Sequence, residues 1–217
     1  MVNWMMDKPG KIDTPVGGRH SCYTLGFYFA CLWNDLNIVN RLLDIQDHDL
    51  LKVDALITAT DVSAFVDVGG DPIQEGIPED YVATAFFVAC CGGCPDLVQR
   101  LLELPAGSIN FDFCPLGTTG FMAACFSGHV AVVNLLLQLP EGTINIQTKG
   151  GEGYNGFMYA CSKGHLSVIK SFLELPQGRF NVDETNIWGK TGLEIAVRKG
   201  HLDVAAAITQ YQSDNSE

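Results

Sequence analysis

Cysteine and histidine are the side chains in this sequence whose types and regular spacing invite a chemical interpretation. Cys31, Cys90, Cys125 and Cys161 occupy equivalent positions in four related segments. Histidines follow glycine at intervals of 36 residues, at His129, His165 and His201. A zinc site needs ligands that converge on one point, whereas residues that recur once per segment lie displaced along the fold. We therefore expect the thiols to fill a core, where cysteine is a common small residue.

Two shorter patterns match known chemical motifs in part. Cys91 and Cys94 form a Cys-x-x-Cys pair, but no second pair stands at a spacing suitable for a metal site. Gly189-Lys190-Thr191 is similar to the end of a phosphate-binding loop, although Glu184 stands where that motif requires glycine. No catalytic triad or pair of carboxylates stands out, so we predict no enzymatic activity, no cofactor and no bound metal. A small metal or redox site is the weakest alternative, built from His20, Cys22, Cys91 and Cys94.

The segments that carry these residues are variants of one pattern. Three of them begin at Gly117, Gly153 and Gly189, 36 residues apart, and each contains the Gly-His step. A fixed period in this range is typical of a stacked-repeat architecture, in which each unit buries its apolar face against its neighbours.

Within each segment the sequence predicts a helix, a tight turn, a second helix and a loop. In the third segment Thr119 is placed to cap a helix that ends near Ser127, and Gly128 stops it because glycine tolerates the left-handed conformation. A second helix is expected from about Val130 to Leu139, since its apolar residues follow the helical period. A Leu-Pro-x-Gly step then ends the segment.

The front of the chain carries the same pattern less regularly. Repeats are expected at about 20–46, 81–116, 117–152, 153–188 and 189–211, between an N-terminal extension, 1–19, and a polar tail, 212–217. The first two repeats are separated by an insertion, 47–80, with nine acidic residues and one lysine. Apolar and polar residues alternate around Val53–Thr58 and Ala64–Val68, which predicts a short hairpin.

This pattern resembles the ankyrin-repeat family from about residue 20 to residue 211. The matching features are the Gly-x-Thr turn at Gly117 and Gly189, a small Ala-Ala or Ala-Cys pair, the Gly-His step and the leucine-rich second helix. The resemblance implies an all-α solenoid of helix-turn-helix units with β-turn or hairpin finger loops, and a role in protein–protein interaction. It also implies that the repeated histidines hydrogen-bond to turn backbone.

The sequence departs from the family at the start of the first helices. The family's Thr-Pro-Leu-His has glycine in place of proline at Gly120, Gly156 and Gly192. We expect each glycine to loosen its helix start by up to ~1 kcal/mol. The resemblance further implies an asparaginyl hydroxylation site, but the favoured interpretation is that each asparagine caps its loop through the side-chain amide; the residues are Asn110, Asn145 and Asn181.

Composition narrows the class of partner and the compartment. The formal net charge of −12 argues against a nucleic-acid binder, which normally shows a basic stripe. The N-terminal residues lack the apolar core of a signal peptide, and no apolar run is long enough to span a membrane. We therefore expect a monomer with reduced thiols in the cytosol or nucleus, although a bacterial effector delivered into a host cytosol would have the same features.

Several residues are left on the expected finger and groove face once the repeat pattern is accounted for. Aromatic side chains are enriched at binding hot spots, and basic residues gather toward the C-terminal end, opposite the acidic insertion. A protein or peptide bound along this face would therefore have a fixed direction. In the alternative, insertion 47–80 fills the groove in cis, which makes the domain autoinhibited or purely structural. The predicted partner-binding residues are Trp33, Tyr81, Leu116, Phe126, Tyr154, Lys163, Trp188, Lys190 and Arg198.

Overall fold

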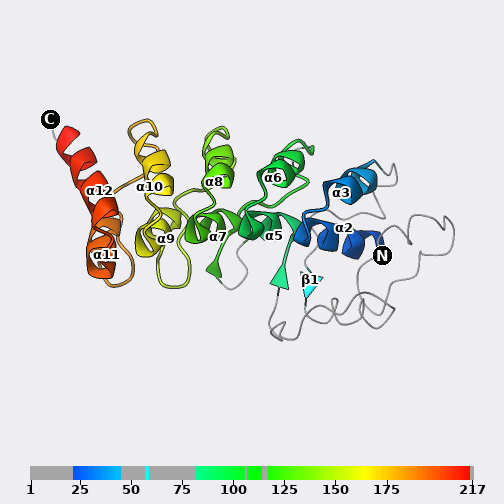
Figure 1. Cartoon of the computed structure of the whole chain (residues 1–217), viewed down its shortest axis with the longest axis horizontal. Coiled ribbons are helices and arrows are strands. Elements are labelled where there is room, and N and C mark those ends of the chain that lie inside the picture. Colours follow the sequence, from blue (N-terminus) through cyan, green and yellow to red (C-terminus); the bar gives the residue numbers. More distant parts are fainter. Residues whose placement is uncertain (1–21, 45–56, 59–81, 106, 114–116, 216–217) are drawn as a thin grey trace. The chain divides into compact units, whose positions relative to one another are not determined.

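The computed structural model describes residues 22–44, 57–58, 82–105, 107–113 and 117–215. Over these residues the chain forms ten α-helices and two short strands, in an all-α repeat architecture of helix pairs (Figure 1). It divides into two compact units, Met1–Ala89 with Asp96–Asn110, and Cys90–Pro95 with Phe111–Glu217. The elements are α2 (Cys22–Leu32), α3 (Leu36–Leu43), β1 (Ile57–Thr58), β2 (Val82–Ala83), α5 (Ala85–Gly92), α6 (Pro95–Leu102), α7 (Gly120–Ser127), α8 (Val130–Leu137), α9 (Gly156–Lys163), α10 (Leu166–Leu173), α11 (Gly192–Lys199) and α12 (Leu202–Asp214).

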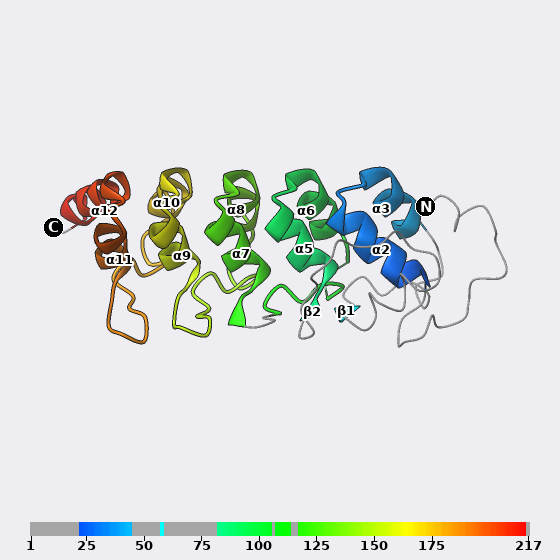
Figure 2. The same cartoon turned by 60° about the horizontal axis from the view of Figure 1, so that its bottom comes forward.

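The second unit contains the helix pairs α7–α8, α9–α10 and α11–α12, which lie side by side in chain order (Figures 1 and 2). The first helix of each pair contacts the first helix of the next, and α10 contacts both α8 and α12. Each pair therefore covers the apolar face of its neighbour, as a stacked repeat requires.

Each first helix of this unit begins at a polar cap and ends at a glycine. The Thr119 hydroxyl oxygen accepts a hydrogen bond from the Met122 N–H at 3.2 Å, and Gly128 has a φ of 76° at the other end. The predicted cap and stop are thereby confirmed. Helix α8 ends at Leu137, two residues before the predicted end, because Leu139 N–H turns back to the Leu136 carbonyl at 3.3 Å. Asn155 and Gly164 bound α9 in the same way, and Thr191 and Gly200 bound α11.

Burial explains why the helical period is clearer in α8 than in α7. In α7 every residue from Gly120 to Cys125 is buried, because the helix is enclosed on several sides. Helix α8 buries only Val132, Val133, Leu136 and Leu137, which form one stripe. Helix α8 therefore leaves one side partly exposed, whereas α7 exposes only its last residues.

The repeated histidines link each repeat to the preceding one. Nε2 of His129, His165 and His201 lies 2.9, 2.9 and 3.2 Å from the backbone carbonyls of Cys91, Phe126 and Ser162 respectively. A carbonyl oxygen only accepts, so Nε2 is the protonated nitrogen in each pair. The backbone role implied for these histidines is confirmed.

Three glycines at equivalent turns, Gly93, Gly128 and Gly164, also make room for the histidine of the next repeat. A Cβ on Gly93, Gly128 or Gly164 would lie only 2.3 to 2.6 Å from Nδ1 of His129, His165 or His201. All three glycines have a positive φ, which disfavours any other residue. At Gly200 the φ is also positive, at 82°, but a Cβ there would have no neighbouring atom of the described chain within 4 Å.

A second close contact explains two of the glycines that replace the family's proline, Gly156 and Gly192. A Cβ on Gly156 would lie 2.9 Å from a ring carbon of Phe121, and one on Gly192 would lie 2.7 Å from a ring carbon of Phe157. These phenylalanines fill the space between first helices and extend into a cluster of rings with Phe172. The expectation that the glycines only loosen the helix starts is therefore incomplete, because they permit aromatic packing between repeats.

The first unit has other residues at the turn where the later repeats have the Gly-His step. Asn34 adopts a φ of 55°, which asparagine tolerates better than most residues, and the Asp35 carboxylate caps α3 by accepting from the Ile38 N–H at 3.1 Å. In the next repeat the Arg100 guanidinium donates to the Asn40 side-chain oxygen at 2.9 Å.

One boundary expectation is corrected, and the expected hairpin stays a prediction. Strand β1 pairs antiparallel with β2, so Thr58 faces Val82 at the start of the second repeat. Residues 64–68, the other arm of that hairpin, lie outside the described residues. Helix α12 continues to Asp214, past the expected end near Tyr211, because polar side chains of its last turns hydrogen-bond along the helix, as Ser213 does to the Thr209 carbonyl at 3.0 Å.

The two roles of glycine before histidine can be separated by a matched pair of variants. Gly200→Ala introduces only the left-handed strain and should cost about 1 kcal/mol of unfolding free energy. Gly128→Ala should cost roughly 2–4 kcal/mol, because the new Cβ also displaces the His165 ring and breaks its hydrogen bond. Urea unfolding followed by circular dichroism measures both, and equal losses would contradict the contact.

The glycine at the start of α11 gives a second test. Alanine normally stabilises a helix relative to glycine by about 1 kcal/mol, but Gly192→Ala should destabilise this protein because of the Phe157 ring. In a Phe157→Leu background the same substitution should be neutral or stabilising. A double-mutant cycle from urea unfolding measures the coupling, and additive effects would show that the ring does not require the glycine.

Candidate partner-binding face

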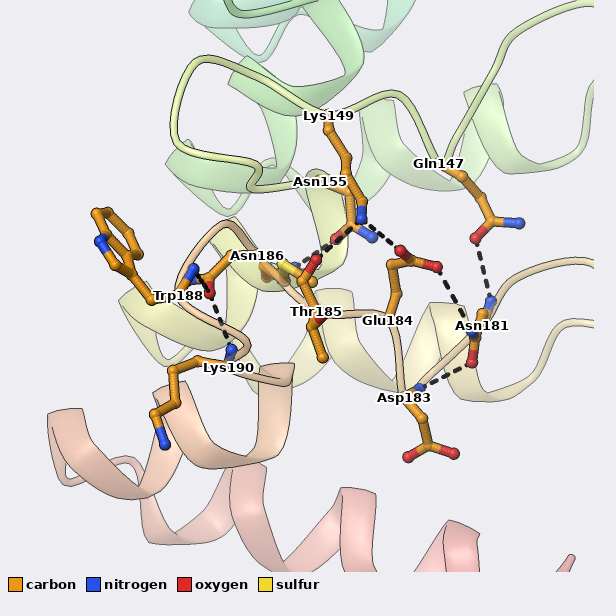
Figure 3. A network of polar contacts seen from close by, with 11 residues as sticks. Gln147, Lys149, Asn155, Asn181, Asp183, Glu184, Thr185, Asn186, Trp188 and Lys190 are labelled. Carbon is orange, nitrogen blue, oxygen red and sulfur yellow. Dashed lines mark hydrogen bonds and ion pairs between the residues drawn. The ribbon is translucent and has the colours of Figure 1, made fainter.

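A hydrogen-bonded turn presents Trp188 at the tip of the last finger loop. The Asn186 side-chain oxygen accepts from the backbone N–H groups of Trp188 at 3.0 Å and Lys190 at 2.9 Å (Figure 3). Asn186 itself is buried, and Gly189 supplies the positive φ that closes the turn. The turn is therefore fixed by a buried amide, while the Trp188 side chain remains 57% exposed.

A salt bridge fixes the base of the same loop to the preceding finger. The Lys149 ammonium pairs with Glu184 and also donates to the Thr185 carbonyl at 2.9 Å (Figure 3). The hydrogen bond from Lys149 lowers the pKa of the Glu184 carboxyl, so this carboxylate keeps its charge to a lower pH than it would without the partner. Successive finger loops are thus connected at their bases.

Four aromatic rings form a continuous strip across two successive repeats of the second unit, 117–152 and 153–188. The Phe126 and Tyr159 ring centroids are 5.8 Å apart, those of Tyr159 and Tyr154 are 5.3 Å apart, and those of Tyr154 and Trp188 are 6.3 Å apart. These separations fall in the range of favourable ring contacts. We call these four residues the aromatic strip. Its two ends, Phe126 and Trp188, are exposed.

The expectation that Tyr154 is an exposed contact residue is wrong. Its side chain is only 7% exposed and packs with Met158 and Ile195 in a small core cluster, with Tyr159 against it. The ring is covered by Ile195 of the following repeat, which the position of Tyr154 within its own repeat does not reveal. Tyr154 is therefore a buried member of the strip that contacts the rings of Tyr159 and Trp188.

An open groove of about 460 Å³ lies beside the strip, and we call it the α11 groove. Its apolar walls include Trp188, Leu193 and Val197, and Val197 is 54% exposed. In α7 and α9 the equivalent residues, Cys125 and Cys161, are fully buried by the next repeat. This face of α11 is therefore open among the described residues, whereas the same face of α7 and α9 is covered. Its full lining is Tyr154, Asn186, Trp188, Lys190, Leu193, Glu194, Ile195, Val197 and Arg198.

Basic side chains border both the strip and the groove. The Lys163 ammonium lies 4.2 Å from the centroid of the Phe126 ring, a cation–π contact that leaves the charge exposed. Lys190 pairs with Glu194 at 3.0 Å, and its hydrogen bond lowers the pKa of that carboxyl. Arg198 is exposed on the groove wall.

Three predicted contact residues, Trp33, Tyr81 and Leu116, are not part of the strip or the α11 groove as described. Trp33 belongs to the first unit, is 48% exposed and stacks on Phe29 with a centroid separation of 5.4 Å. Tyr81 and Leu116 lie outside the described residues. The sequence interpretation missed Tyr159, Leu193 and Val197. Tyr159 had a detectable signal, because it is a large aromatic at the position that Ala123 holds in the preceding repeat.

The recurrent thiols lie in the core, as expected. Cys90, Cys125 and Cys161 are buried and reduced, and Cys31 is also buried. Burial raises the pKa of Cys90, Cys125 and Cys161, and it raises that of Cys91 to about 11. A thiol with a raised pKa is a poor nucleophile near neutral pH.

The metal alternative gains no support within the described residues, where no three potential ligands gather around one point. The Cys94 thiol donates to the Gly92 carbonyl at 3.5 Å. His20 lies outside the described residues, and so does the side chain of Cys22.

The loop asparagines act locally. The Asn145 side-chain oxygen accepts from the Gln147 N–H at 3.1 Å, and that of Asn181 accepts from the Asp183 N–H at 3.0 Å (Figure 3 shows the second). This is the loop-capping role that the sequence interpretation favoured for these two residues.

Comparison with known families accords with the geometry. A family model described as "Ankyrin repeats (3 copies)" matches residues 27–149 and 121–217. The chain therefore belongs to the ankyrin-repeat family, whose members are generally protein–protein interaction modules. No curated protein gives a significant match. None of the helices in the described ranges has the length and apolar character needed to cross a bilayer.

The raised thiol pKa values predict how stability depends on alkaline pH. In the unfolded chain cysteine ionises near 9.0, whereas the folded protein holds Cys91 protonated up to about 11. The stabilisation is complete below the lower value and is lost as the pH rises through this window, because the unfolded chain has then released protons that the native state retains. Unfolding free energy measured by urea titration should therefore fall over this range. Cys161→Ala should reduce the slope, and an unchanged slope would contradict the burial of that thiol.

Proposed function

We propose that this protein is a non-catalytic interaction module that binds a protein or peptide along its finger face. The aromatic strip carries the proposal, because a contiguous row of rings with exposed ends is unusual on a protein without a partner. The partly buried Tyr159 contacts the Phe126 ring and the buried Tyr154 contacts the Trp188 ring, which restricts both exposed rings, so little side-chain entropy is lost on binding.

The sequence supports the proposed repeat boundaries and the proposed cellular compartment. Five repeats, with the first two separated by the acidic insertion 47–80, are supported by the five helix pairs of the described residues. We propose a monomeric scaffold in the cytosol or nucleus that takes neither nucleic acid nor membrane as its partner, on the basis of its net charge of −12.

The second candidate function is an autoinhibited or purely structural domain, in which insertion 47–80 occupies the groove along the finger face of its own chain. Its motivation is charge, since nine acidic residues in that segment would complement Lys163 and Arg198. Deleting the segment should then raise the affinity for an external partner, whereas an open face predicts no change.

Alanine substitution tests the strip directly. The double variant Phe126→Ala, Trp188→Ala should weaken binding of a partner identified by affinity capture and mass spectrometry by at least about tenfold, because exposed aromatic anchors each contribute roughly 1–2 kcal/mol or more. Far-UV circular dichroism should not change. Leu202→Ala is the control, because Leu202 is 69% exposed but lies outside the strip and the groove. Unchanged affinity of the double variant, or an equal loss in the control, would reject the site.

A further inference from the structure

The α11 groove has the features of a binding site for one chemical class of ligand. We propose that it binds an acidic peptide segment: a large apolar side chain enters between Trp188 and Val197, a carboxylate pairs with Arg198, and a carbonyl accepts a hydrogen bond from the Asn186 amide. This inference rests on the proposed function and assigns it a partner chemistry.

The groove walls favour an apolar side chain at the centre. Trp188 and Val197 are 57% and 54% exposed, and Leu193 lies between them in sequence and on the same wall. A volume of about 460 Å³ is of the size that holds a small ligand or a few side chains of a peptide. Covering these surfaces removes apolar area from water, which supplies the affinity.

The charges around the groove favour an anionic segment. Glu194 is the one acid that lines it, and Lys190 neutralises this carboxylate at 3.0 Å. Within the described part of the chain Arg198 has no ion-pair partner, and Lys199 follows it on the same helix with none either. The groove is therefore locally positive in a protein whose net charge is −12, so an acidic ligand is attracted to this place and repelled by most of the remaining surface.

A buried amide supplies the third, independent observation. Asn186 lines the groove and is only 6% exposed, and its side-chain oxygen is fully used by the N–H groups of Trp188 and Lys190. Its amide nitrogen makes no hydrogen bond to any residue that the structure describes. A buried donor without a partner is costly, and a carbonyl or carboxylate oxygen of a bound peptide would satisfy it.

The apolar walls, the Arg198 charge and the Asn186 amide together favour an acidic peptide with an apolar side chain over other classes of ligand. A basic or neutral peptide would leave the Arg198 guanidinium unpaired, and an acidic peptide without an apolar side chain would leave Trp188 and Val197 in water. A phosphopeptide offers the anion but needs no apolar centre, so it becomes an outcome of the test.

The experiment uses three blocked synthetic peptides and the full chain labelled with ¹⁵N. One peptide carries a central leucine among aspartates and glutamates, the second has lysines in place of the acids, and the third has serine in place of the leucine. The indole N–H signal of Trp188, assigned with Trp188→Phe, should shift with the first peptide alone. The Trp33 indole is the internal control, because that residue belongs to the other unit.

Two variants test the polar contacts. Arg198→Glu should weaken binding of the acidic peptide by about tenfold or more, whereas Lys170→Glu, a charge reversal on α10 away from the groove, should change it less than about twofold. Asn186→Asp retains an oxygen for the two turn hydrogen bonds but removes the amide donor, and should also weaken binding while the Trp188 signal of the free protein persists.

Three outcomes would overturn the inference: equal shifts with the lysine peptide, equal shifts with the serine peptide, or no effect of Arg198→Glu. A phosphorylated serine peptide that binds more tightly than the leucine peptide would overturn it in favour of a phosphate site. If strip variants abolish partner capture while the acidic peptide leaves Trp188 unmoved, this inference fails and the proposed function stands. If capture also survives in the strip variants, both fail.

Discussion

The close approach of successive repeats is the constraint on which the second unit depends. Each histidine ring rests over a glycine of the preceding repeat and bonds to a carbonyl there, as His165 does to Phe126 at 2.9 Å. Each phenylalanine at the start of a first helix rests against the glycine of the next, as Phe157 does at Gly192. Neither contact has room for a Cβ. The distance and angle between repeats are thus set by residues without side chains, and the intervening rings fill the space.

The candidate partner-binding face follows from that spacing. Because the first helices are held close, aromatic residues from two successive repeats reach one another and form a continuous strip from Phe126 to Trp188. The Asn186 turn and the Lys149–Glu184 pair then fix the last finger loop against the preceding one. Function and stability are therefore coupled, since a change in repeat spacing would separate the rings as well as the core.

The architecture and the caps could be predicted from the sequence because they depend on local rules. The period of 36 residues, the Thr119 cap and the Gly128 stop are properties of one repeat, and each is readable without its neighbours. The exposure of Phe126 and Trp188 also agrees with the prediction, because both stand where the repeat pattern places finger or helix-end positions.

Features that depend on two repeats at once could not be predicted in this way. Tyr154 is buried by Ile195 from the next repeat, and Tyr159 completes the strip only because Phe126 and Tyr154 approach it from either side. The glycines that replace proline were expected to weaken their helices, whereas the structure shows that they accept phenylalanine rings. The α11 groove is likewise lined by residues of two repeats, with Tyr154 and Asn186 from one and Val197 and Arg198 from the next.

The protonation of the histidine rings tests the contact between repeats most directly. Long-range ¹H–¹⁵N correlation spectra, recorded where imidazole is neutral, distinguish a proton on Nε2 from one on Nδ1. The account predicts the Nε2-protonated tautomer for His129, His165 and His201, since each Nε2 faces a carbonyl that can only accept. Nδ1-protonated rings, or rings that exchange between the two tautomers, would contradict it.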